Sequence, residues 1–165
     1  MIFFQTTIGA VHTLFALLAM ISGAYVILTI KGNSLHKKVG YFYFATMLVM
    51  NVTGLFTRTL FVFGPFHFLA TFSLFTILFG MAWPVFFKHR KNWLYWHFQA
   101  MAWSYVGLWA AFASEVIVRL PFVEFGIMFS LMVAVASCCV MVIGGFFIVK
   151  YKKSVATKVA NKPMH

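Results

Sequence analysis

The chain has 165 residues, of which 63% are hydrophobic and 20% are aromatic, while only 9% are charged. A soluble globular domain carries about 25% charged residues, so this composition excludes an ordinary soluble domain and indicates a membrane protein. The formal net charge is +11. Because the basic residues lie in short loops and a tail beside apolar segments, membrane topology and anionic headgroups explain this charge better than a nucleic-acid partner does.

Five apolar segments are each long enough to cross a hydrocarbon core of about 30 Å as a helix. They predict an all-α fold, a polytopic membrane protein with five transmembrane helices in an up-down bundle. The bundle is expected to form one domain, 1–149, followed by a basic cytoplasmic tail, 150–165, that frays. The predicted spans are 3–30, 40–63, 65–87, 93–120 and 122–149, with Pro65 introducing the third span and Pro84 kinking it near its end.

The distribution of basic residues predicts the orientation of the chain. Of the 13 lysines and arginines, all except Arg58 and Arg119 lie in the loop after the first span, in the loop after the third span, or in the tail. Loops rich in lysine and arginine stay in the cytoplasm, so the N-terminus is predicted outside and the C-terminus inside. This pattern favours a multi-pass protein of a bacterial inner membrane.

Four histidines lie in or beside the first four spans, one for each span. Ionisable side chains are costly at membrane depth, and imidazole is a common metal ligand, so this placement is the strongest functional signal. The predicted topology sorts them into an outer pair, His12 and His67, and an inner pair, His36 and His97. Each pair joins helices separated by one helix in sequence, and such helices can face each other across an up-down bundle.

Two stacked pairs of imidazoles suit two b-type haems, because each haem iron takes two axial ligands on opposite faces of the macrocycle. We therefore predict an outer haem between His12 and His67 and an inner haem between His36 and His97. Nearby basic side chains are candidates to contact the haem propionates: Lys37, Lys38 and Arg58.

Structural roles are also open to these histidines. Small and polar residues share a helical face with three of them, and such stripes also serve ordinary helix packing in membranes. His36 stands beside two lysines, which is typical of a solvated rim residue, and His67 follows Pro65 in the first turn of a helix, which is typical of a helix-end residue. His12 is the hardest to assign to such a role, although it is expected to lie deeper than His67.

Carboxylates are scarce in this chain. The only acids are Glu115 and Glu124, and there is no aspartate. Di-metal carboxylate sites, glycosidase pairs and acid-containing triads all need residues that are missing here, so a redox role is favoured over a hydrolytic one. Glu115 and Arg119 are four residues apart on one predicted helix, the spacing of an intrahelical ion pair.

Four short motifs carry a family resemblance. They are the stretch from His12 to Gly23, the sequence His36-Lys-Lys-Val-Gly-Tyr, the sequence Phe66-His67-Phe-Leu, and His97-Phe-Gln-Ala-Met101 with Tyr105. In this order they resemble the bacterial membrane family called domain of unknown function 2306, over the first four spans and part of the fifth. The resemblance implies an integral membrane fold in which the histidines act as a set. It supplies no reaction.

A more distant likeness is architectural. Cytochrome b561-like proteins also place histidine pairs toward the two membrane faces, on helices separated by one helix in sequence. This analogy of architecture adds modest support to the haem hypothesis.

The leading functional prediction is an integral membrane b-type haem protein, with one or two haems, that carries electrons within or across the membrane. Quinone is a candidate partner beside the lipid bilayer, and no nucleic acid is expected. One alternative is a cofactor-free accessory or assembly subunit of a larger membrane complex, which the small size and the 22 phenylalanines favour. A second alternative is a small transporter or metal-ion binder that uses the same histidines.

Overall fold

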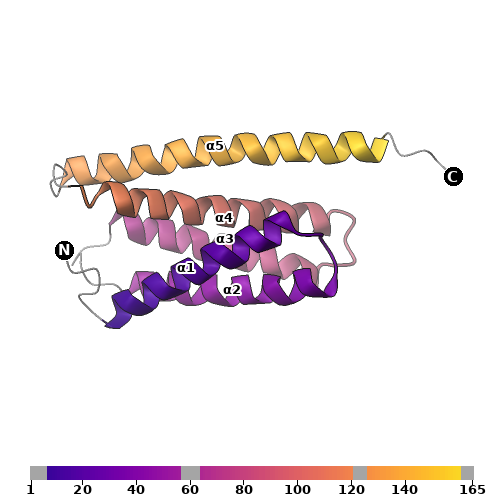
Figure 1. Cartoon of the computed structure of the whole chain (residues 1–165), viewed down its shortest axis with the longest axis horizontal. Coiled ribbons are helices and arrows are strands. Elements are labelled where there is room, and N and C mark those ends of the chain that lie inside the picture. Colours follow the sequence, from indigo (N-terminus) through magenta and orange to yellow (C-terminus); the bar gives the residue numbers. More distant parts are fainter. Residues whose placement is uncertain (1–6, 57–63, 121–125, 161–165) are drawn as a thin grey trace.

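The computed structural model describes residues 7–56, 64–120 and 126–160, with side chains described as far as Tyr151. These ranges form five helices and contain no strand, so the all-α prediction is confirmed (Figure 1). The helices are α1 (Thr7–Leu28), α2 (Ser34–Leu55), α3 (Pro65–Phe86), α4 (Trp93–Ile117) and α5 (Ile127–Ala160).

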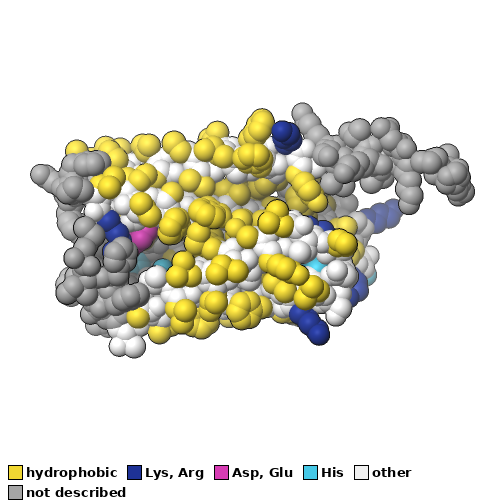
Figure 2. Space-filling model, viewed as in Figure 1, with side chains coloured by type: hydrophobic (Ala, Val, Ile, Leu, Met, Phe, Trp, Pro, Cys, Tyr) yellow, Lys and Arg dark blue, Asp and Glu magenta, His cyan; other side chains and the backbone are white. Residues whose placement is uncertain are grey.

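Four of the helices, α1, α3, α4 and α5, are long and apolar enough to cross a membrane. Helix α2 falls outside this set, since it carries Lys37 and Lys38 in its first turns and Asn51 in its interior. Apolar side chains cover the sides of the molecule, and lysine and arginine side chains lie toward its ends (Figure 2). This is the construction of a helical membrane protein.

Helices α1 to α4 pack in chain order into a four-helix bundle, and a smaller contact between α1 and α4 closes the ring. Helix α5 lies outside this ring along α4, with a minor contact to α3 (Figure 1). Across the described ranges, the backbones of α1 and α3 make no contact, and neither do those of α2 and α4. Each predicted histidine pair therefore sits on two helices that lie opposite each other.

A layer of tyrosines joins three helices in the middle of the bundle. Gly23 of α1 is buried, and a Cβ added there would lie 2.5 Å from Cδ2 of Tyr105 and 2.9 Å from Cε2 of Tyr43. The Tyr105 hydroxyl donates to the Met20 carbonyl oxygen at 3.2 Å, and the Tyr43 hydroxyl is hydrogen-bonded to the Ser104 hydroxyl at 3.0 Å. The small-residue face of α1 thus receives aromatic rings from α2 and α4.

The helix boundaries that differ most from those predicted are the start of α2 and the end of α5. Helix α2 begins at Ser34 rather than at residue 40, because the Asn33 side-chain oxygen accepts the backbone N–H of His36 at 2.7 Å and caps the helix. His36 therefore lies inside the first turn of α2. Helix α5 continues past Val149 to Ala160, since neither glycine nor proline interrupts this stretch. The last seven residues of the predicted second span, 57–63, lie outside the described residues.

Candidate functional site

His97 is tied to the backbone of the neighbouring helix. Its Nδ1 lies 2.8 Å from the carbonyl oxygen of Gly80 on α3. A carbonyl oxygen only accepts, so the hydrogen must be on Nδ1, and a neutral ring then carries its free lone pair on Nε2. Nε2 is the nitrogen that this arrangement leaves available to a ligand.

The Gly80 carbonyl is available because of Pro84. Inside an α-helix each carbonyl accepts from the N–H four residues later. For Gly80 that residue is Pro84, which lies within α3 and has no N–H. The proline thus leaves the Gly80 carbonyl without a partner in α3, and His97 donates a hydrogen bond to it.

Gly80 also allows the two helices to approach closely. A Cβ added at Gly80 would lie 2.9 Å from Sδ of Met101 and 3.1 Å from Cβ of Ala100. Because any side chain at Gly80 would push α4 away, the glycine keeps His97 within reach of the carbonyl. The sequence feature that indicates this contact is a glycine, Gly80, four residues before a proline inside the helix, Pro84. The sequence analysis treated Pro84 only as the cause of a kink and did not predict the free carbonyl.

His36 lies near His97 at the end of the bundle where α1 meets α2 and α3 meets α4, which we call the basic end (Lys31, Lys37, Lys38, Lys88, Arg90 and Lys91). Its Nδ1 is buried and has no hydrogen-bond partner in the described part of the chain. The pKa of His36, in the polar first turn ahead of the apolar part of α2, is lowered by burial, then by the charge of Lys31 and by that of His97 when it is protonated. The lowered pKa favours the neutral form of His36, which keeps a free lone pair.

Lys31 holds its charge in place by capping α1. Its ammonium donates to the carbonyl oxygens of Val26 and Ile27 in the last turn of that helix, where a positive charge is favourable. On the face of α2 that carries His36, a Cβ added at Gly40 would meet no atom within 4 Å. The inner pair thus combines a neutral His36, an oriented His97 and free space one turn beyond His36.

His12 has the same kind of backbone bond at the opposite end of the bundle. Its Nδ1 lies 2.9 Å from the carbonyl oxygen of Met50 on α2, so Nδ1 carries the hydrogen and Nε2 the lone pair. Its ring packs against Gly54, where an added Cβ would lie 3.2 Å from Cε1 of His12 and 3.8 Å from Cβ of Ala70. His12 therefore reaches the level of Ala70, one turn inside the bundle from His67.

His67 caps the start of α3. Its Nδ1 accepts the backbone N–H of Gly64 at 3.2 Å, so a neutral ring carries its hydrogen on Nε2. This is the helix-end role that the sequence analysis left open for His67. Its tautomer, with the hydrogen on Nε2, is opposite to that of His12 and His97. The outer pair therefore combines one imidazole oriented for ligation and one engaged in capping.

A protein-family model described as "Predicted membrane protein (DUF2306)" matches residues 9–151. The chain belongs to this family. The match includes the four candidate histidines of this DUF2306 protein, His12, His36, His67 and His97, and confirms the resemblance predicted from its motifs. No curated protein and no solved structure matches the chain, so the likeness to cytochrome b561 stays a prediction.

The other charged side chains that the structure describes in this DUF2306 protein lie at the surface. Arg119 donates from Nε to Oε1 of Glu115 at 3.1 Å, so the predicted ion pair on α4 is present, with both side chains partly exposed. Lys37 and Lys38 are exposed next to His36, while Arg58 lies outside the described residues. Within the described ranges, no group of three or more His, Cys, Asp or Glu side chains could hold a metal ion.

Replacing Pro84 with alanine is expected to release His97 from Gly80. The new N–H would compete for the Gly80 carbonyl, and α3 would gain stability because proline costs up to about 3 kcal/mol within a helix. In nitrogen NMR spectra of the histidine rings, His97 should change from the Nδ1–H form alone to a mixture of tautomers. Pro65→Ala, at the first position of α3, adds an N–H that does not compete for the Gly80 carbonyl, so it should leave His97 unchanged. An unaltered His97 spectrum in Pro84→Ala would contradict the role given to the proline.

Proposed function

We propose that this DUF2306 protein is an integral membrane b-type haem protein that carries electrons within or across the membrane. The observation that supports this most is the shared geometry of His12 and His97, each of which donates from Nδ1 to a backbone carbonyl. Histidines that bind metals usually donate their other ring N–H to a carbonyl or carboxylate, which fixes the ring and directs the free nitrogen at the metal.

The inner pair fits a haem best. A haem iron already has four porphyrin nitrogens, so two imidazoles from opposite sides complete its coordination. His36 and His97 come from α2 and α4, which lie opposite each other in the ring of helices. Partial burial lowers the pKa of His36 and so favours the neutral form, the form in which it would bind an iron. The exposed Lys37 and Lys38 are the candidates to contact the propionates.

The outer pair is the candidate for a second, weaker haem. His12 already has the tautomer that an axial ligand needs, whereas His67 would have to release the Gly64 N–H and move its hydrogen to Nδ1. Losing such a cap costs about 1 kcal/mol. We therefore expect the inner pair to fill first, with Arg58 as the candidate contact for an outer propionate.

The proposal includes the topology expected from charge. In this topology α2 crosses the membrane together with α1, α3, α4 and α5. It packs between α1 and α3 and turns polar side chains such as Thr46 and Asn51 into the bundle, where they are almost fully buried. The basic end faces the cytoplasm and the N-terminus lies outside, in a cell inner membrane. A bound haem supplies one-electron transfer, and quinone dissolved in the bilayer is the candidate partner.

An optical spectrum of the full chain tests this function. Protein expressed with sufficient haem and purified in detergent is expected to show a b-type reduced-minus-oxidised difference spectrum, with one or two haems per chain. Folded protein that stays colourless after addition of haemin would contradict the proposal. Stoichiometric copper or zinc without haem would favour the metal-binding alternative instead, and a stable protein partner without a chromophore would favour the accessory subunit.

A further inference from the structure

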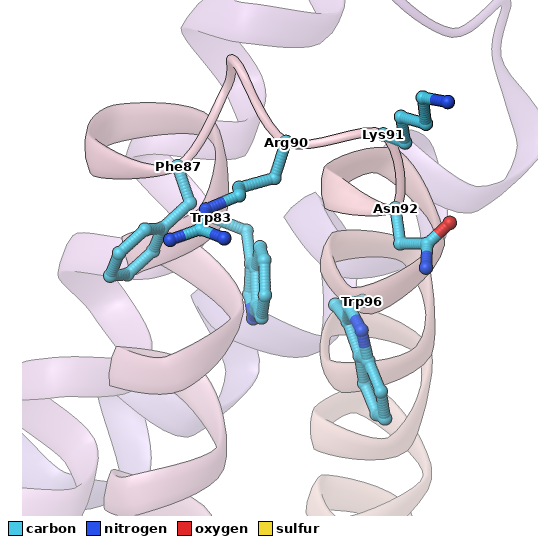
Figure 3. Close-up of a pocket in the computed structure, with 6 residues that line it drawn as sticks. All are labelled: Trp83, Phe87, Arg90, Lys91, Asn92 and Trp96. Atoms are coloured by element: carbon cyan, nitrogen blue, oxygen red, sulfur yellow. The ribbon is translucent and has the colours of Figure 1, made fainter.

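A pocket of about 310 Å³ lies at the basic end, between the last turn of α3 and the first turn of α4. Six residues line it: Trp83, Phe87, Arg90, Lys91, Asn92 and Trp96. Figure 3 shows the Arg90 side chain turned back toward the rings of Phe87 and Trp83, while the Lys91 side chain extends away from them. Two turn bonds shape this loop, from the Arg90 N–H to the Phe87 carbonyl at 2.9 Å and from the Trp93 N–H to the Arg90 carbonyl at 3.1 Å.

The pocket is positively charged and has no counter-charge of its own. Its two charged residues, Arg90 and Lys91, are both cations, and no acid lines it. The chain has only two acids, and the described one, Glu115, is paired with Arg119 at the opposite end of α4. Two cations with no acid beside them favour an anion rich in acceptor oxygens.

Aromatic rings connect the pocket to the apolar side of the bundle. The rings of Trp83 and Trp96 stack with 18° between their planes and 6.1 Å between their centroids. Phe79, one turn farther along α3 toward the membrane middle, contacts both indoles edge-on at 5.8 and 6.2 Å and is 49% exposed. Tryptophans at the ends of membrane helices lie at headgroup level. A molecule with its anion beside Arg90 would therefore have apolar surface beside Phe79.

We propose that this pocket binds the phosphate headgroup of an anionic phospholipid, with Arg90 as its main phosphate contact and Lys91 as a second cation at the rim. The stacked indoles pack against the glycerol region, and the first acyl carbons lie along Phe79. The charge of the pocket selects an anionic over a zwitterionic lipid, and the aromatic surface selects a lipid over free phosphate. This inference does not depend on haem binding.

The test uses the full chain purified in a nonionic detergent and titrated with phosphatidylglycerol, phosphatidylcholine or inorganic phosphate. Binding is measured by native mass spectrometry and by the rise in unfolding temperature, since a ligand that binds only the folded state stabilises it. Phosphatidylglycerol is expected to bind and to raise the unfolding temperature, with phosphatidylcholine and inorganic phosphate much weaker. Arg90→Gln should weaken phosphatidylglycerol binding about fivefold or more.

Lys88→Gln provides the matched control, because Lys88 is an exposed cation of the same loop that does not line the pocket. It should bind phosphatidylglycerol nearly as the unaltered protein does. Equal losses in Arg90→Gln and Lys88→Gln would reduce the effect to general surface charge and overturn the proposal. Inorganic phosphate that binds as tightly as the lipid would overturn it as well. Circular dichroism of each variant establishes that it is folded.

Discussion

Replacing His97 with asparagine is expected to abolish haem binding at the inner pair while leaving the bundle folded. The asparagine amide can still donate to the Gly80 carbonyl from near the position of Nδ1, but it offers no nitrogen in place of Nε2. Haem per protein, measured by absorbance, should fall by about half if both pairs are filled and to near zero if only the inner pair is. His97→Leu would also leave the carbonyl buried and unsatisfied, at a cost of about 1–3 kcal/mol.

Two further variants make this result specific. His36→Leu should have the same effect on the haem spectrum as His97→Asn, because both ligands are needed for one low-spin iron. His89→Leu alters an exposed histidine of the loop between α3 and α4 and should leave the spectrum intact. If His97→Asn kept full haem content, the inner pair would not be the haem site.

Replacing Gly23 with alanine is expected to destabilise the fold strongly. The added methyl would lie 2.5 Å from Cδ2 of Tyr105, too close for any real contact, so the tyrosine layer would have to move. Overpacking of this kind costs about 1–3 kcal/mol, and the hydrogen bond from Tyr105 to the Met20 carbonyl would be lost with it. The free energy of unfolding, measured by titration with a denaturing detergent, should fall by that amount.

Gly107 of α4 is the matched control for this substitution. A Cβ added there would meet no atom within 4 Å. Gly107→Ala should therefore raise the stability by up to about 1 kcal/mol, because alanine favours a helix more than glycine does. Tyr105→Leu combined with Gly23→Ala should recover part of the loss, as expected of two residues in contact. Equal stabilities for Gly23→Ala and Gly107→Ala would contradict this account of the tyrosine layer.

Helix positions could be predicted from the sequence where an abrupt change in residue type marks an end. Helix α3 begins at Pro65 and α4 at Trp93, as predicted, because a proline suits the first turn and a basic loop precedes the tryptophan. The start of α2 was missed because the prediction placed it where the apolar residues begin, at residue 40. The helix itself begins where Asn33 can cap it, among polar residues.

The candidate site was readable in part. Composition and topology single out the four histidines, but the atoms they contact depend on how helices slide and rotate against each other, which a single sequence does not contain. The bond from His12 to the Met50 carbonyl is of this kind. The capping role of His67 was more local and was foreseen as an alternative, because Gly64 and Pro65 stand directly before it.

Pro84 has a mechanical consequence for the seam between α3 and α4. Most carbonyls inside a regular helix already accept one N–H of their own helix, and near Gly80 the seam consists of small or flexible side chains such as Ala100 and Met101, which tolerate sliding. The Gly80 carbonyl lacks that internal partner, so its bond to His97 favours one axial alignment of α3 and α4. A shift of His97 by one helical turn toward the start of α3, about 5.4 Å, would set it against a carbonyl that already accepts an N–H.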